Sequence, residues 1–385
     1  MKIKNILAVS AVALLGLSSC SKWTDMEIQH PMDLTKPAHT EEYYKALRDY
    51  KNSDHQIAFA YYSAWTGVGT NMQSSLMGLP DSVDLVSLWG GWKNPTEAQL
   101  KDLRMAQEKK GLKAMICFLV LDMGGGITPD PTDAEKAQLK EGEVWAHKYW
   151  GWSSENAEAG KAARRAAVVK YANAICDVID KYGYDGFDID AEPRYAHPFS
   201  TKYELWRTDV EENVPTLMTL FIETLGKRIG PMAETEAGRK KILAVDGEPD
   251  ALPATHAKYF NYFIIQAYSN SVGYQNRHFQ GMLSAYKDVL SVEDICKKSI
   301  FVVNFESGAT RGGEVGLVQI LNFALQNPVV DGVTYRKGGV GAFRVDLEYA
   351  VSTPEVVNGI DMSPVKGLSY PWWRRAIQLM NPIIK

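Results

Sequence analysis

The sequence has few cysteine residues, and their spacing does not support a disulfide framework. After Cys20 the sequence contains three cysteines at wide separations, Cys117, Cys176 and Cys296. Three is an odd number, so they cannot all pair with one another. Each lies in a strongly apolar segment, so we expect three buried free thiols. The spacing offers neither a metal site nor an evident nucleophile, and we expect no metal and no cofactor.

The sequence also lacks a basic tract. Its 42 Lys and Arg residues stand against 46 Asp and Glu residues, a net charge of −4. Nucleic acid is therefore not an expected partner. No Gly-x-Gly-x-x-Gly follows the first expected strand, which argues against a dinucleotide-binding sheet. The hydrophobic content of 45% is ordinary for a globular protein and allows a full core.

Long apolar runs are also absent after the first residues, so no later segment is expected to cross a membrane. Met1 to Lys4 is basic, Ile6 to Leu17 is apolar, and Leu17-Ser18-Ser19-Cys20 resembles a bacterial lipobox. We expect a signal peptide over 1–19, lipidation of Cys20, an anchor and tether over 20–50, and a folded domain over 51–385. An ordinary signal with a chance cysteine is the alternative. The expected location is the outer membrane; we favour the cell surface over the periplasmic side.

What the sequence does contain is a regular alternation of apolar strands and helices. Strands are expected at 57–62, 83–89, 113–120, 184–192, 242–246, 262–268, 300–306 and 339–346. Helices are expected at 41–49, 96–110, 162–181, 215–229, 254–260, 278–298, 316–326 and 372–380, with a less regular one near 74–79. This alternation predicts a parallel sheet with right-handed crossovers, and eight units predict an α/β fold of the closed (β/α)8 TIM barrel type. A doubly wound open sheet is the alternative.

Polar residues stand at the ends of several expected strands, where a barrel of this type carries its chemistry. These residues are Glu192, Asp246, Gln266, Tyr268, Asn304, Glu306, Arg344 and Asp346. Two long segments rich in aromatic residues follow the third and fourth strands. We expect both to lie over the same face, which would bring Trp145, Trp150 and Trp206 to the site.

The fourth strand is the most unusual segment. Asp188, Asp190 and Glu192 alternate with Phe187, Ile189 and Ala191, so the three acids share one face. A half-exposed edge strand with a solvated acidic face is one interpretation. Stacked carboxylates repel each other, however, so the pattern favours a function for them.

Asp185-Gly186-Phe187-Asp188-Ile189-Asp190-Ala191-Glu192 resembles the Asp-Gly-x-Asp-x-Asp-x-Glu signature of glycoside hydrolase family 18. That family comprises chitinases and endo-β-N-acetylglucosaminidases on (β/α)8 barrels, with the signature on the fourth strand. The resemblance implies substrate-assisted retaining hydrolysis, in which the N-acetyl oxygen of the substrate attacks the anomeric carbon. Glu192 would be the acid and base, and Asp190 would hold the acetamido N–H. Asp188 and Asp185 would support them.

The resemblance extends to the sixth strand, where Gln266-Ala267-Tyr268 is similar to the Met/Gln-x-Tyr element of the family. Tyr268 would donate to the acetamido oxygen and Gln266 would contact the sugar; a core or rim tyrosine is the alternative for Tyr268. Asn304, Glu306, Arg344 and Asp346 are further candidates for substrate contacts, with structural ion pairs as the alternative. Crowding of Asp188 against Asp190 predicts a shared proton and a protonated Glu192.

The eighth strand lacks the tryptophan that chitinases of this family usually carry. It reads Gly341-Ala342-Phe343-Arg344-Val345-Asp346-Leu347, closer to the bacterial endoglycosidases. We therefore expect a monomeric endo-β-N-acetylglucosaminidase that cleaves the GlcNAc-β-1,4-GlcNAc bond of N-linked glycans on glycoproteins. A chitinase and a non-catalytic glycan-binding lipoprotein are the alternatives.

Overall fold

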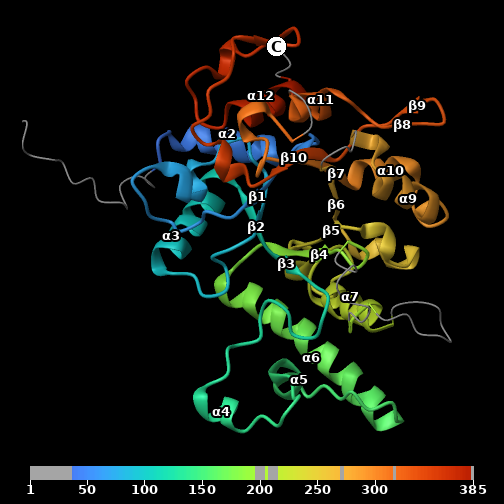
Figure 1. The fold of residues 1–385 in the computed structure, drawn as a ribbon. Coiled ribbons are helices and arrows are strands. Elements are labelled where there is room, and N and C mark those ends of the chain that lie inside the picture. Colours follow the sequence, from blue (N-terminus) through green and yellow to red (C-terminus); the bar gives the residue numbers. More distant parts are fainter. Residues whose placement is uncertain (1–36, 196–203, 207–215, 269–272, 315–317, 383–385) are drawn as a thin grey trace, which may run out of the picture.

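Eight parallel strands close into a barrel in the computed structural model, which describes residues 37–195, 204–206, 216–268, 273–314 and 318–382. The strands follow one another around the ring in sequence order, and β10 closes it against β1. Figure 1 looks into this ring, with the helices outside it. The strands are β1 Ile57–Tyr62, β2 Leu85–Leu88, β3 Lys113–Leu119, β4 Gly186–Ala191, β5 Ile242–Gly247, β6 Tyr262–Gln266, β7 Ser299–Asn304 and β10 Gly339–Phe343. The (β/α)8 prediction is confirmed, and the open sheet is not what forms.

Side chains alternate between the inside of the barrel and the helix layer. On β4, Phe187, Ile189 and Ala191 pack outward into the large core shared with the helices. A smaller cluster fills the ring and comprises Phe59, Tyr61, Leu85, Met115, Cys117, Ala244, Ile264, Ile300 and Val302. Asp188 and Asp190 belong to the inward face and are almost fully buried. All three thiols after Cys20 are buried and free, as expected.

Most expected helices form near their predicted limits. The principal ones are α2 Glu41–Lys51, α3 Glu97–Met105, α6 Glu158–Tyr182, α7 Thr216–Arg228, α9 Arg277–Tyr286, α10 Val292–Lys298, α11 Gln319–Leu325 and α12 Pro371–Met380. Thr96 and Gln99 make a reciprocal capping box at the start of α3, which satisfies two backbone N–H groups. Gly183 ends α6 in the left-handed conformation at φ 66°.

Four predicted elements differ from the structure. The helix expected over 278–298 is two helices, because Ser291 caps a new one by accepting from the Asp294 N–H. The segments expected as helices at 74–79 and 254–260 are short 3-10 turns, Met72–Ser74, Leu76–Gly78 and Ala254–Tyr259. The eighth strand ends at Phe343, since Arg344 takes a left-handed backbone conformation with φ 54°.

The helix α2 packs against the barrel instead of belonging to a tether. Tyr44 is buried, and the Arg48 guanidinium donates to the carbonyls of Glu108 and Lys109 at 3.0 and 2.9 Å. The folded part therefore starts about ten residues before the expected boundary at residue 51. The expected signal peptide and Cys20 lie outside the described residues.

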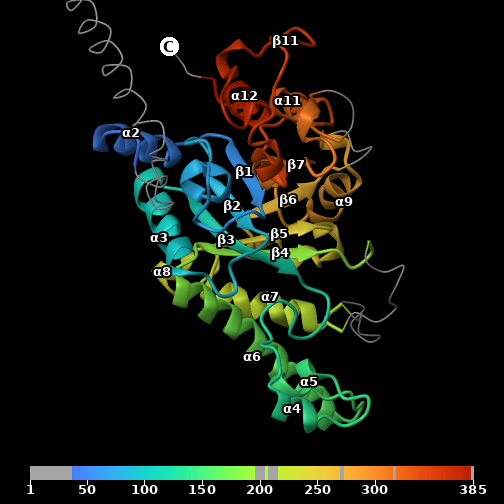
Figure 2. The ribbon, with the colours of Figure 1, turned by 60° about the vertical axis from the view of Figure 1, so that its left-hand side comes forward.

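The segment between β3 and α6 was expected over the mouth of the barrel, and the structure corrects this prediction. It forms two short helices, α4 Asp133–Ala137 and α5 Trp145–Trp150, beside the start of α6. Figures 1 and 2 show them projecting sideways from the barrel. Trp150 packs on Tyr171 of α6 with ring centroids 5.3 Å apart, and Lys170 donates to the Tyr149 carbonyl. Among the described residues, no helix is both long and apolar enough to span a membrane.

Candidate active site

An open cavity of about 890 Å³ lies at the carboxyl ends of the strands. Seven of the sequence candidates line it, namely Asp190, Glu192, Asp246, Gln266, Tyr268, Asn304 and Glu306. Carboxyl ends of parallel strands converge at one face, which explains why residues more than a hundred positions apart meet here. The structure thus brings together the acids of β4 and the polar residues of β6 and β7.

Glu192 and Asp190 lie on the same inward-facing side of the chain at the end of β4. Asp190 is 4% exposed, whereas Glu192 is partly open to the cavity. Burial, and then the charge of Glu248, raise the pKa of Glu192, while hydrogen bonding from Gln266 lowers it. Burial, Glu192 and Asp188 raise the pKa of Asp190 well above its ordinary value. A carboxyl group at the mouth of the cavity therefore keeps its proton to higher pH than a free glutamic acid does.

Asp188 lies deeper, inside the barrel. The Ser87 hydroxyl of β2 donates to its Oδ2 at 2.6 Å. Burial raises its pKa from 3.8 to about 6, although hydrogen bonds from Ser87 and neighbouring groups lower it. The expected crowding of Asp188 and Asp190 is present, and the charge of Asp188 adds to the rise in the pKa of Asp190.

Tyr268 and Gln266 face the acids from β6. The Gln266 amide donates to Asp246 Oδ1 at 2.6 Å. Burial, followed by Asp246, Asp190 and Glu192, raises the pKa of Tyr268 well above 10, so its hydroxyl stays neutral and can donate a hydrogen bond. An uncharged donor opposite two carboxyl groups suits a neutral polar ligand such as an amide.

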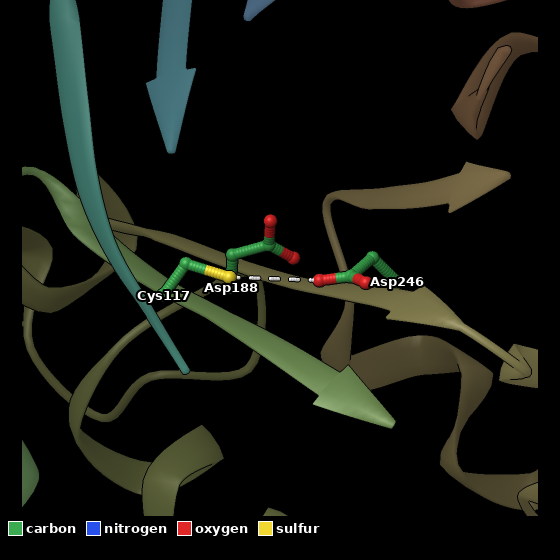
Figure 3. A group of neighbouring side chains, drawn as sticks. All are labelled: Cys117, Asp188 and Asp246. Atoms are coloured by element: carbon green, nitrogen blue, oxygen red, sulfur yellow. Dashed lines mark hydrogen bonds between the residues drawn. The ribbon is translucent and has the colours of Figure 1, made fainter. Parts of the chain in front are cut away.

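Asp246 was predicted as a polar residue at the end of a strand, and the structure shows that it is also deeply buried. It is 1% exposed and lies level with Asp190, since β4 and β5 pair in register at these residues. Figure 3 shows its carboxyl group facing Cys117 and Asp188, with the thiol 3.7 Å from Oδ2. These three side chains are of types that can ligate a metal. Burial and the two aspartates, however, raise the pKa of the Cys117 thiol, which favours the protonated, non-ligating form.

Several other predicted contacts are not at the cavity. Arg344 pairs with Asp346 at 3.1 Å and with Glu306 at 3.5 Å, and neither Arg344 nor Asp346 lines the cavity. The ion-pair alternative describes both residues. Asp185 lies at the opposite end of β4, where Lys113, the Gln107 amide and the Ala114 N–H donate to it, so its contacts are structural.

The three tryptophan candidates also make contacts elsewhere. The Trp145 indole donates to the Pro129 carbonyl and the Trp150 indole to Thr128 Oγ1, both within the lateral segment around α5. The Trp206 indole donates to the Val120 carbonyl after β3. None of the three lines the described cavity.

A family described as "Glycoside hydrolase family 18, BT1044-like" matches residues 21–358. The chain belongs to glycoside hydrolase family 18. Endo-beta-N-acetylglucosaminidase F2 of Elizabethkingia meningoseptica is 23% identical over 343 residues, covering 86% of this chain and 84% of that protein.

Two solved structures are similar to this chain. A variant of BT1044 has 31% identity and a TM-score of 0.67, over 91% of this chain and 97% of that one. The endo-beta-N-acetylglucosaminidase of Cordyceps militaris has 20% identity and a TM-score of 0.55, over 92% and 99%, which shows the shared fold.

Within this family 18 barrel, four aromatic side chains cluster at the cavity around the end of the last strand. Phe343 ends β10, and the rings of Tyr61, Trp89 and Tyr268 surround it with centroids 5.8, 6.2 and 5.9 Å away. All four residues line the cavity. Apolar ring faces at the base of a polar cavity suit the C–H face of a sugar. One feature of the sequence pointed to this group, since each residue lies within two positions of the end of a strand.

Glu248 is another cavity residue that was not predicted from the sequence. It follows β5, is 2% exposed and lines the cavity, and its Oε2 accepts the Arg194 N–H at 2.7 Å. Its Oε1 is buried without a partner among the described residues. The sequence does hold a signal, because Asp246-Gly247-Glu248 repeats the spacing of Asp190-Ala191-Glu192 on the neighbouring strand.

Proposed function

We propose that this family 18 hydrolase is an endo-β-N-acetylglucosaminidase that cleaves the GlcNAc-β-1,4-GlcNAc bond of N-linked glycans. The observation that carries the proposal is the complete acid set at the open cavity, with Glu192 at the mouth, Asp190 beneath it and Tyr268 opposite. The names of the relatives from E. meningoseptica and C. militaris agree with this activity.

The proposed mechanism is retaining and substrate-assisted. Glu192 donates its proton to the leaving glycosidic oxygen while the acetamido oxygen attacks the anomeric carbon and forms an oxazolinium ion. Asp190 accepts the acetamido N–H and stabilises the positive charge, and neutral Tyr268 donates to the acetamido oxygen. Glu192, now ionised, removes a proton from water, which attacks the same carbon and restores the configuration. No cofactor takes part in these steps.

The cellular setting is also a proposal. A lipidated Cys20 would hold the enzyme in the outer membrane, most usefully on the cell surface where glycoproteins are accessible. The chain would act as a monomer, since all the residues assigned above come from one barrel.

Digestion of defined glycoproteins tests the activity. Wild-type protein should release high-mannose, hybrid or complex glycans and leave one GlcNAc on asparagine, as seen by mass spectrometry. Glu192→Gln should lose about 1,000-fold or more in kcat and keep glycan binding, because the amide cannot donate the acid proton. Glu355→Gln, which changes an exposed glutamate paired with Lys366, is the matched control and should keep full turnover.

Other outcomes would support the alternatives. Cleavage of chitin oligomers without cleavage of glycoproteins would indicate a chitinase. Glycan binding by calorimetry with no hydrolysis of either substrate would indicate a binding protein.

A further inference from the structure

The strand β5 places a third carboxyl group beside the aspartate pair of β4. Asp190 pairs in register with Asp246, and Asp188 pairs with Ala244. Asp246 therefore lies next to Asp190 on the neighbouring strand and faces Asp188 inside the barrel. Three carboxyl groups thus share one compartment inside the barrel, each no more than 4% exposed.

The hydrogen-bond donors around these groups are too few for three carboxylates. The Ser87 hydroxyl donates to Asp188 Oδ2, the Gln266 amide donates to Asp246 Oδ1, and the Cys117 thiol donates to Asp246 Oδ2 at 3.7 Å. Asp188 Oδ1 and Asp190 Oδ1 are buried with no donor from the described residues. An O–H on a neighbouring carboxyl group would supply the missing donor, since a protonated acid both donates and accepts.

We propose that Asp246 is a protonated positioning residue, whose Oδ2–H donates to Asp190 and fixes that carboxylate for the acetamido group. Its Oδ1 accepts from Gln266, which also bonds Glu192. Asp246 therefore connects the two groups that act in hydrolysis through one chain of hydrogen bonds. The inference rests on the proposed function for its consequence in turnover, but the protonation of Asp246 is independent of it.

The side chains that surround Asp246 on the neighbouring strands also favour its protonated form. The titratable groups around it are Tyr61 on β1, Cys117 on β3, Asp188 and Asp190 on β4, Glu192 after β4, and Tyr268 after β6. All of them are acids. Burial, and then Asp190 and Asp188, raise the pKa of Asp246 well above its usual value. A proton on Asp246 removes one of three mutually repelling charges.

The substitution Asp246→Asn tests whether Asp246 is protonated or ionised. Asparagine has the shape of a protonated aspartic acid, with a carbonyl for Gln266 and an N–H for Asp190. We expect kcat within about 5-fold of wild type and an unchanged alkaline limb of the pH–kcat profile. An ionised Asp246 would instead raise the pKa of Glu192, so its neutralisation would move that limb about one pH unit or more downward. That shift would overturn the proposal.

The substitution Asp246→Ala removes the donor altogether. We expect a fall of about 100-fold in kcat with KM changed only a few-fold, because Asp190 is then free to turn away from the acetamido group. Asp102→Asn is the control for the loss of a buried aspartate outside the cavity. The Asp102 carboxylate accepts hydrogen bonds from Trp65, Ser75 and Leu76. Loss of its charge should therefore lower the melting temperature without changing the pH–kcat profile. Equal kcat for wild type and Asp246→Ala would contradict a positioning role.

Infrared spectroscopy provides a measurement that does not depend on turnover. The carbonyl stretch of a protonated carboxyl group is distinct from that of a carboxylate, and Asp246→Asn should remove one protonated-carboxyl band near neutral pH. Loss of a carboxylate band instead would refute the proposal even if the enzyme is active. If the proposed function fails, this band still reports the state of Asp246. Metal analysis of the purified protein completes the test, since a stoichiometric divalent ion at Cys117, Asp188 and Asp246 would exclude the proton.

Discussion

The pKa of Glu192 is set by a balance of contacts that the structure identifies individually. Burial and Glu248 raise it, whereas the Gln266 amide and His278 lower it. His278 is itself tied to Asp250 at 2.8 Å, and Asp250 also binds Arg194 at 2.9 Å. A network outside the signature strand thus helps to set the pH range in which the proposed acid is protonated.

The substitution Glu248→Gln tests this balance. A general acid works only while it holds its proton, so turnover falls as pH rises through its pKa. Glu248→Gln removes the negative neighbour and should move the alkaline limb of the pH–kcat profile downward by roughly half a unit to one unit. The measurement is kcat from pH 5 to 9 on one glycopeptide.

Glu355→Gln is again the control, because it removes one exposed negative charge outside the cavity. An identical limb in wild type and Glu248→Gln would mean that Glu192 does not sense Glu248.

At the scale of the element, β5 approaches β4 closely beside the proposed acid. Gly247 takes φ +80°, and a Cβ atom there would lie 2.6 Å from the Ala191 carbonyl oxygen and 2.9 Å from Glu192 Cγ. Glycine is the residue that allows both the left-handed backbone and this close approach. The position of Glu192 therefore depends on the lack of a side chain at Gly247.

We expect Gly247→Ala to lower kcat about 10- to 100-fold by displacing the Glu192 side chain. Gly359→Ala is a matched control, because Gly359 has φ +78° but nothing within 4 Å of an added Cβ. Both variants should lose about 1 kcal/mol of stability from backbone strain. Kinetics and thermal unfolding of the two variants separate the strain from the contact; equal turnover in both would show that Glu192 tolerates the added methyl group.

Strand order and the acidic face of β4 could be predicted because both depend on short-range periodicity. The contacts of Arg344 could not, since they follow from one left-handed backbone residue that ends β10. The position of α5 could not either. It depends on Trp150 packing against Tyr171, which lies 21 residues further along the chain on a different helix. Glu248 was overlooked because its role depends on the register between β4 and β5.

For the whole molecule, the acid-lined interior makes stability depend on pH. An acid whose pKa is raised on folding binds more protons in the folded state, so folding stability falls as pH rises from the unfolded to the folded pKa. For Asp188 this interval runs from 3.8 to about 6. Complete ionisation would cost about 3 kcal/mol on that shift, and coupling to Asp190 and Asp246 extends the interval upward.

We therefore expect the free energy of unfolding to be higher at pH 5 than at pH 7.5, by about 2–3 kcal/mol. Two histidines act in the same range with opposite signs. The hydrogen bond and charge of Asp84 outweigh burial and raise the pKa of His55, while burial lowers that of His256. Urea unfolding at half-unit steps from pH 4.5 to 8 measures how the free energy of unfolding depends on pH.

Asp246→Asn should make this dependence on pH weaker, because one of the three interior carboxyl groups no longer titrates. If the histidines caused the dependence, the variant would have the same slope as wild type. Stability that rises with pH over this range would contradict a protonated interior.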